Sequence, residues 1–163
     1  MMDAERLREL FDYDPETGVF RNRVYRGGRC RVGDVTGTVI PGGYKNIRIA
    51  RKTYRAARLA WLWMTGEWPE HEIDHIDRDP GNNRWSNLRQ ATRSQNVQNK
   101  RVNKNNAAGL KGVFLDKRRG HWFSSIMLDG KVTNLGRFPT PEEAHAAYMQ
   151  AAARLFGQFA YRP

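Results

Sequence analysis

The most informative feature of this chain is a run of polar residues whose types and spacing suit the hydrolysis of a phosphodiester bond. The run reads Glu72-Ile73-Asp74-His75-Ile76-Asp77, then Asn82-Asn83, then Ser86-Asn87-Leu88-Arg89, then Thr92 and Asn96. Carboxylate and carboxamide oxygens are ligands for a hard divalent cation, and a neutral imidazole can take a proton from water near neutral pH. With a bound ion, these groups could activate water and stabilise the leaving alkoxide.

The residues around this run predict a strand, a loop, a second strand and a helix. Residues 72–76 and 88–91 are typical of short strands, and the polar segment between them contains Pro80-Gly81. Thr92 is the predicted N-cap of a helix over 93–100. Since successive strand side chains point to opposite faces, Asp74 and His75 can both approach one reaction centre only if one of them lies at a strand end or bulge.

The N-terminal part predicts a β-rich extension. A short amphipathic helix is expected over 3–11, a turn at 14–18, and an exposed basic hairpin or loop over 19–31. Residues 44–49 and 53–57 predict a hairpin, and 58–66 a helix that Gly66 ends.

The C-terminal part predicts three strands over 112–117, 121–128 and 131–138, followed by a helix that begins at Pro141. The buried stripe expected on that helix is Ala144, Ala147, Tyr148, Ala151 and Leu155. The whole chain is therefore expected to be α+β, with an extension over 1–69, a core over 70–100, a linker over 101–108 and a separate module over 109–163.

Charge identifies the kind of partner. The formal net charge is +11 and the pI is about 10.3, which favours a polyanion, most often nucleic acid. The excess is +5 over 1–69, +2 over 70–106 and +4 over 107–163, so two basic segments flank the carboxylate-rich run. A basic protein without a polyanionic partner is the alternative.

Cysteine content and hydropathy indicate the cellular compartment in which the protein is expected. Cys30 is the only cysteine, which excludes an intrachain disulfide and a cysteine-based zinc site. The N-terminus has no apolar signal core, and the longest apolar stretch, 59–65, is too short to span a membrane. We therefore expect a cytoplasmic protein with no membrane partner.

Residues 72–99 resemble the HNH family of endonucleases, the ββα-metal nucleases found in bacteriophages and as homing enzymes. The resemblance implies that His75 is the general base and that Asp74 and Asn96 hold one Mg²⁺ or Mn²⁺. It gives Asn87 the catalytic role of fixing the loop and orienting the histidine. Asn82, Asn83, Leu88, Arg89, Thr92 and Asn99 look like scaffold. The implied products carry 5′-phosphate and 3′-hydroxyl ends.

The two flanking segments carry resemblances of their own. Residues 1–69 look like the N-terminal extension of phage HNH proteins, although Ala57 stands where histidine is usual in the stretch 56–61. Residues 109–163 resemble the AP2 DNA-binding domain through Lys111-Gly112-Val113, Trp122, Leu135-Gly136-Arg137-Phe138 and Glu142-Glu143-Ala144. That resemblance implies a sheet entering the major groove of double-stranded DNA, with contacts from Lys111, Lys117, Arg118, Arg119, Trp122, Ser124, Lys131 and Thr133.

The sequence thus predicts a metal-dependent HNH endonuclease, phage-encoded or of the homing type, that hydrolyses double-stranded DNA. The alternative is a non-catalytic DNA-binding regulator or architectural protein whose HNH site is inert. An RNA-directed protein is less favoured, because the deep major groove of A-form RNA excludes side chains. The sequence leaves the oligomeric state open, as a monomer or a DNA-induced dimer.

Overall fold

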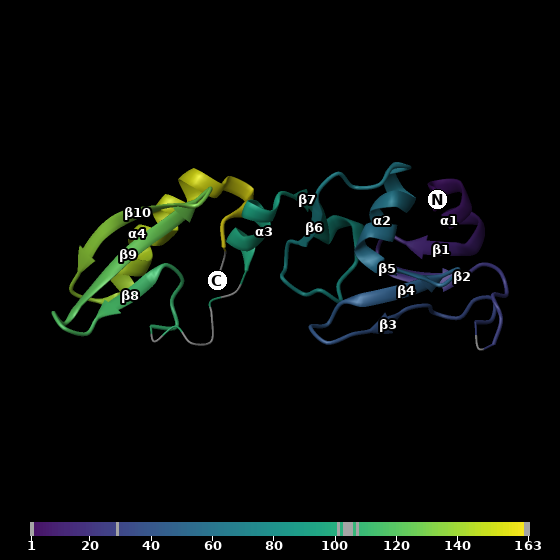
Figure 1. The fold of residues 1–163 in the computed structure, drawn as a ribbon, viewed down its shortest axis with the longest axis horizontal. Helices are drawn as coiled ribbons and strands as arrows, with labels where there is room; N and C mark the ends of the chain where they lie inside the picture. The colour runs from purple at the N-terminus through teal and green to yellow at the C-terminus, as the bar shows by residue number, and fades with distance from the viewer. Residues whose placement is uncertain (1, 29, 101, 103–105, 107, 162–163) are drawn as a thin grey trace. The chain divides into compact units, whose positions relative to one another are not determined.

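The computed structural model describes residues 2–28, 30–100, 102, 106 and 108–161, and the chain divides into two compact units (Figure 1). The first unit is Met1–Ala91 and the second is Thr92–Pro163. Most of the predicted linker lies outside the described residues. In the part of the chain that is described, no helix combines the length and apolarity needed to cross a membrane.

The first unit consists of short antiparallel sheets packed against two helices. In chain order its elements are α1 (Ala4–Leu10), β1 (Phe11–Asp14), β2 (Val19–Asn22), β3 (Thr38–Val39), β4 (Lys45–Ile49), β5 (Lys52–Arg55), α2 (Ala56–Thr65), β6 (Glu72–His75), a 3-10 turn (Trp85–Asn87) and β7 (Leu88–Ala91). Strands β1 and β2 pair with each other, β4 lies between β3 and β5, and β6 pairs with β7. Asp3 caps α1 through its side chain, and Gly66 ends α2 in the left-handed conformation.

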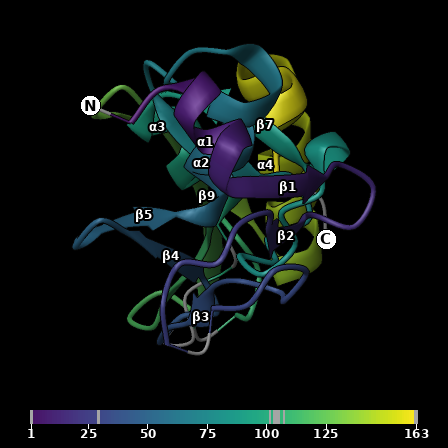
Figure 2. The same cartoon turned by 90° about the vertical axis from the view of Figure 1, so that its right-hand side faces the viewer.

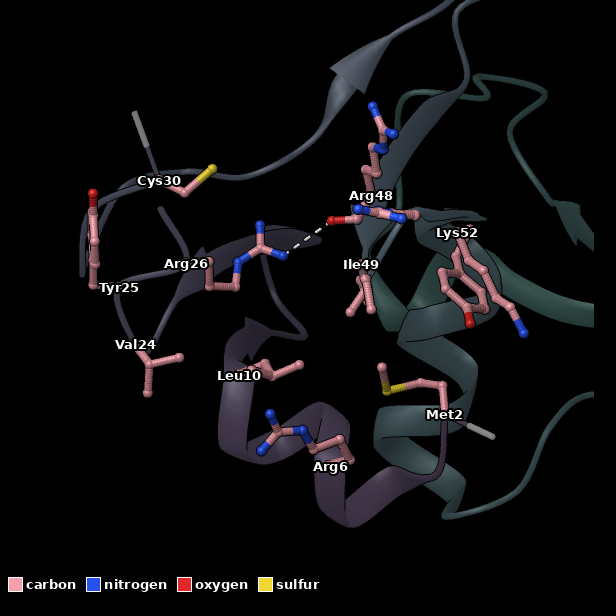
Figure 3. Close-up of a pocket in the computed structure, with 13 residues that line it drawn as sticks. Met2, Arg6, Leu10, Val24, Tyr25, Arg26, Cys30, Arg48, Ile49 and Lys52 are labelled. Atoms are coloured by element: carbon pink, nitrogen blue, oxygen red, sulfur yellow. Dashed lines mark hydrogen bonds between the residues drawn. The ribbon is translucent and has the colours of Figure 1, made fainter. Parts of the chain in front are cut away.

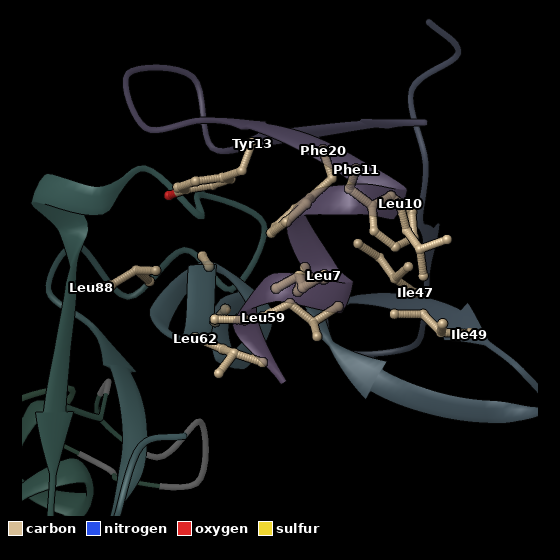
Figure 4. Packing of buried hydrophobic residues seen from close by; sticks show 14 residues of the cluster. Leu7, Leu10, Phe11, Tyr13, Phe20, Ile47, Ile49, Leu59, Leu62 and Leu88 are labelled. Atoms are coloured by element: carbon tan, nitrogen blue, oxygen red, sulfur yellow. The ribbon is translucent and has the colours of Figure 1, made fainter. Parts of the chain in front are cut away.

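The core of this unit lies where α1 and α2 meet the sheets. Leu7, Leu59 and Leu62 are almost fully buried, and Phe11 and Phe20 pack edge to face with ring centroids 6.2 Å apart (Figure 4). Figure 2 shows α1 and α2 next to each other, beside the β4–β5 hairpin. The hairpin over β1 and β2 falls partly in the segment predicted as an exposed basic hairpin or loop, yet Phe20 and Asn22 are buried.

The second unit is a three-stranded antiparallel sheet with one long helix. Its elements are α3 (Arg93–Asn99), β8 (Val113–Asp116), β9 (His121–Leu128), β10 (Lys131–Phe138), α4 (Pro141–Phe156) and a 3-10 turn (Gly157–Phe159). The sheet order is β10-β9-β8, and α4 packs against it. Thr92 caps α3 in a capping box with Gln95, as predicted for its N-terminus.

The buried stripe of α4 differs from the prediction at its C-terminal end. Ala144, Tyr148 and Ala151 are buried as expected, but Leu155 is 47% exposed. Ala152 and Phe156 occupy the buried positions instead, because the 3.6-residue period brings residues four apart from Tyr148 onto its face.

Gly112 provides a test of this packing. Its φ is +74°, and a Cβ atom there would lie 1.9 Å from Cδ2 of the Tyr148 ring. We expect Gly112→Ala to lower the free energy of unfolding by about 3 kcal/mol, from the left-handed backbone and the overpacking together. Gly120→Ala is the matched control, because Gly120 has φ +66° with no atom within 4 Å of the added Cβ. Urea unfolding of both variants checks this, and equal losses would contradict the predicted clash.

Candidate active site

The site begins at the end of β6, where a buried carboxylate and a buried imidazole follow each other. His75 is the last residue of β6, which fulfils the sequence requirement that one of the pair lie at a strand end. Asp74 is paired across the ladder with Arg89 of β7. The Nε and Nη2 atoms of Arg89 donate to Oδ2 of Asp74 at 2.9 and 2.7 Å. Asp74 is only 5% exposed, and the ion pair compensates its buried charge. Arg89, predicted only as scaffold, is therefore the charge partner of Asp74.

The imidazole of His75 is oriented by Asn83. Nε2 of His75 lies 3.2 Å from Oδ1 of Asn83, and both residues are buried. The carboxamide orientation is fixed because Nδ2 of Asn83 donates to the carbonyl of Gly81 at 3.2 Å. An amide oxygen only accepts hydrogen bonds, so in the neutral ring the proton sits on Nε2. The basic nitrogen of the ring is therefore Nδ1.

The loop between the two strands is held by Asn87 and Asp77. Asn87 donates through Nδ2 to the carbonyl of Asn82 at 2.8 Å and to Oδ1 of Asp77 at 2.9 Å. Its Oδ1 accepts from the backbone N–H of Asp77 at 3.0 Å. Asn87 thus fixes the loop, whereas the side chain that contacts the His75 ring is Asn83.

Asp77 is the cap of this loop. Its carboxylate accepts from the N–H of Asp79 at 2.8 Å and from the Asn82 side chain at 2.6 Å. Partial burial of this carboxyl raises its pKa, but the hydrogen bonds from Asp79, Asn82 and Asn87 outweigh burial and lower the pKa below its ordinary value. The loop is therefore held by an ionised Asp77, and this contribution is lost as the pH falls through the lowered pKa.

The β1–β2 hairpin packs against the same loop from the N-terminal side. The Tyr13 hydroxyl donates to the carbonyl of Asn83 at 2.7 Å, and the N–H of Trp85 donates to the carbonyl of Pro15 at 2.9 Å. A Cβ atom at Gly18 would lie 2.3 Å from the carbonyl carbon of Asn83, so the two backbones touch. Burial, with a smaller effect from Asp14, raises the pKa of Tyr13, which keeps its hydroxyl a hydrogen-bond donor.

The β3–β4 turn contributes a second contact. The ring centroid of Tyr44 lies 6.2 Å from that of His75 in an edge-to-face arrangement, and the guanidinium of Arg55 lies over the Tyr44 ring at 4.7 Å. A Cβ atom at Gly43 would lie 2.9 Å from Cγ of Pro80. Elements far apart in sequence therefore surround the histidine and its loop.

Asn96 lies in the second unit, on α3, where its backbone N–H donates to the carbonyl of Thr92 at 2.9 Å. Its assignment as an ion ligand rests on the residue pattern. Within the described residues, no three side chains of histidine, cysteine, aspartate or glutamate gather as a group that could hold a metal.

The predicted DNA contacts of the C-terminal sheet fall on two different faces. Directly paired residues share a face, and the pairs Val113–Ser124 and Leu115–Trp122 place Trp122 and Ser124 on the side that α4 covers. Lys131 and Thr133 pair with Leu128 and Ile126 on that same side, although both remain exposed.

These four residues therefore differ from the expected open-face placement, and the side chain of Ser124 is fully buried. The opposite face presents the next residues along each strand: Phe114, His121, Phe123, Ser125, Met127, Asn134 and Arg137. A shift of one residue changes the face because strand side chains alternate.

The remaining candidates lie at the turns. Lys117, Arg118 and Arg119 are exposed between β8 and β9, where the backbone of both arginines donates to Oδ1 of Asp116. Nζ of Lys111 donates to the carbonyls of Gln98 and Lys100 and lies over the Tyr161 ring, so this lysine is engaged within the second unit.

Comparison with known proteins identifies the class of the site. Residues 54–98 match the family model described as HNH endonuclease, a range that includes α2 as well as the strand–loop–strand–helix run. Protein 3.8 of Escherichia phage T7 is 34% identical over 114 residues, covering 68% of this chain and 93% of that protein. Residues 54–98 therefore carry an HNH endonuclease domain, and the chain belongs to one family with Protein 3.8 of Escherichia phage T7.

The chain is also similar to a second viral protein and to one solved structure. An uncharacterized HNH endonuclease of Acanthamoeba polyphaga mimivirus is 36% identical over 88 residues, 54% of this chain and 44% of that protein, so this chain matches less than half of its length. The solved structure described as DNA binding and cleavage by the HNH homing endonuclease I-HmuI has a TM-score of 0.46 at 18% identity, covering 95% of this chain and 90% of that chain. Both relatives found by sequence are viral.

The orientation of His75 by Asn83 can be measured directly. In protein labelled with ¹⁵N-histidine, we expect the neutral His75 ring to carry its proton on Nε2, because Asn83 presents an acceptor there. Asn83→Asp keeps an acceptor at this position, so the proton should stay on Nε2. Asn83→Leu removes the acceptor at Nε2 and should lower the population of the Nε2-protonated ring. The exposed His71 is the internal control, and an Nδ1-protonated His75 in the natural protein would refute the assignment.

Proposed function

We propose that this protein is a metal-dependent endonuclease that hydrolyses phosphodiester bonds in double-stranded DNA, acting in the host bacterial cytoplasm. The observation that carries the proposal is the buried pair of Asp74 and the Asn83-oriented His75 at the end of β6. Burying a carboxylate and an imidazole at adjacent chain positions costs free energy, which Arg89 and Asn83 offset here, and buried ionisable groups of this kind are concentrated at functional sites. The match of residues 54–98 to the HNH endonuclease family model supports the same reaction class.

His75 is the proposed general base. With the proton on Nε2 held by Asn83, Nδ1 takes the proton of a water molecule as that water attacks phosphorus in line with the 3′-oxygen. Asn83 then stabilises the doubly protonated ring by accepting a hydrogen bond from its Nε2–H, while Asn87 and Asp77 keep the loop in place. The products would be a 5′-phosphate and a 3′-hydroxyl.

Asp74 and Asn96 are the proposed ligands of one Mg²⁺ or Mn²⁺. Both supply oxygen donors, which fits a hard cation that completes its coordination with water and phosphate oxygens. When bound, such an ion would neutralise charge on the phosphate and on the leaving 3′-oxygen. Arg89 positions the Asp74 carboxylate, because its Nε and Nη2 atoms both donate to Oδ2.

The C-terminal sheet is proposed to be an AP2-like module that holds duplex DNA. Its open face carries the stacked rings of Phe114 and Phe123, 5.2 Å apart, beside a hollow of about 210 Å³ lined by Asp116, His121, Phe123, Asn134 and Arg137. A strand face of this kind can enter a major groove and present donors and apolar groups to base edges. The exposed cations at the β8–β9 turn would contact phosphates.

Cleavage of supercoiled plasmid tests the proposed reaction. The natural protein should produce open-circle or linear DNA with Mg²⁺ or Mn²⁺ and none in EDTA, and His75→Ala should lower the rate by about 10²–10⁴-fold. His71→Ala, which removes an exposed histidine outside the site, should cleave at the natural rate. Tight DNA binding without metal-dependent cleavage would instead favour the non-catalytic regulator.

Charge-matched variants of β10 test the sheet face. Arg137→Gln should weaken duplex binding by roughly tenfold, because Arg137 lies on the open face and can reach bases or phosphates. Lys131→Gln removes the same charge from the same strand on the face that α4 covers, and it should have a smaller effect. Fluorescence anisotropy over a range of salt concentrations measures both. A larger loss for Lys131→Gln would reverse the assignment of the binding face.

A further inference from the structure

The first unit has a large cavity away from the proposed active site. It has a volume of about 760 Å³ and lies between α1, the loop after β2, and the turn joining β4 to β5 (Figure 3). Tyr44 touches the His75 ring at one end of β4, whereas Ile49 lines the cavity at the other. Ile49 is five residue steps along the extended chain from Tyr44, which is about 16 Å.

The lining of this cavity combines cations with apolar surface. Arg6, Arg26, Arg48, Arg51 and Lys52 line it, and no aspartate or glutamate does. Arg6 is paired with Glu9, but the other four make no ion pair with any described residue. The floor is formed by Leu10, Ile49 and Tyr54, with Tyr25 at the side and 65% exposed.

Arg26 is fixed in place without its charge being neutralised. Its guanidinium donates to Oδ1 of Asn22 at 3.0 Å, to the carbonyl of Arg48 at 3.1 Å and to the Thr36 hydroxyl at 3.2 Å, and it lies 4.4 Å from the Phe11 ring centroid. All of these partners are neutral. Figure 3 shows this side chain between Tyr25 and Arg48. A preorganised cation of this kind favours an anionic ligand.

The shape of the cavity distinguishes between kinds of anion. A duplex backbone presents phosphates on a convex ridge and nothing apolar to fill a concave floor. A nucleotide that has left its base pair presents a phosphate and a flat apolar base together, and its size suits a cavity of several hundred Å³. Aromatic rings beside basic side chains are the combination that binds single-stranded nucleic acid.

We propose that this cavity binds unpaired nucleotides of a nucleic-acid strand, with phosphates on Arg26, Arg51 and Lys52 and a base against Tyr25. This site is additional to the proposed nuclease centre. It would hold a strand end or an opened segment next to the duplex that the protein engages.

Cys30 makes the cavity directly observable. It is the only cysteine of the chain, it is half-buried, and it lines the cavity, so its reaction with DTNB reports occupancy. In EDTA, where no metal-dependent cleavage occurs, a twelve-nucleotide oligothymidylate should slow the reaction, whereas a blunt duplex of the same length should not. Tyr25→Leu should raise the Kd of the single strand by about tenfold, as expected for the loss of one stacked base.

Charge variants complete the test. Lys52→Gln should abolish protection of Cys30 at a concentration that protects the natural protein, whereas Arg154→Gln, an equal charge change on α4, should leave protection intact. Protection by the blunt duplex equal to that by the single strand would overturn the proposal in favour of a duplex contact. Absence of protection while anisotropy reports bound single strand would overturn it outright. Neither result depends on whether the protein cleaves DNA.

Discussion

Buried carboxamides must have their hydrogen bonds satisfied, and the geometry of the whole site follows from how Asn83 and Asn87 achieve this. Each side chain spans the loop: Asn87 joins Asp77 to Asn82, and Asn83 joins Gly81 to His75. Because a partly satisfied buried network is costly, the loop has one favourable conformation although it has little regular secondary structure. The same hydrogen bonds that satisfy the buried Asn83 carboxamide also orient the His75 ring, so the orientation of the histidine follows from a requirement of folding.

The β1–β2 hairpin also holds the loop between β6 and β7, although this hairpin lies outside the residues that match the family model. Tyr13 and Pro15 bond to the backbone of the loop, and Gly18 allows the two chains to touch, yet all three precede residue 54, where the match begins. A loop closed by side chains alone would open locally at little cost, as exposed loops generally do. Packing it against a hairpin whose own strands bury Phe11 and Phe20 links the stability of the site to that of the core.

Local signals in the sequence were sufficient for most elements. Strand alternation and turn residues predict β6, β7, β9 and β10, and the Thr92 cap predicts the start of α3. Long-range contacts were not accessible in this way. Asn82 and Asn83 are adjacent and identical in type, and only the packing of Tyr13 and Gly18 shows which one is buried beside the histidine. The sequence predicts the bounds of β9. It does not predict which face of the strand α4 covers, because that depends on long-range packing. Trp122 and Ser124 lie on the side that α4 covers, and their contact with DNA stays a prediction.

The pairing of Asp74 with Arg89 bears on how an ion would bind. A carboxylate that is 5% exposed requires a positive partner whenever no cation is present, and Arg89 supplies it from the neighbouring strand. The same guanidinium repels an arriving cation, so the electrostatic gain from binding is smaller than for an isolated aspartate. The proposed protein ligands are only Asp74 and Asn96. Much of the affinity for an ion would therefore have to come from phosphate oxygens of the nucleic acid. Ion and substrate would then bind cooperatively, and the proposed hydrolysis would be confined to the complex with nucleic acid.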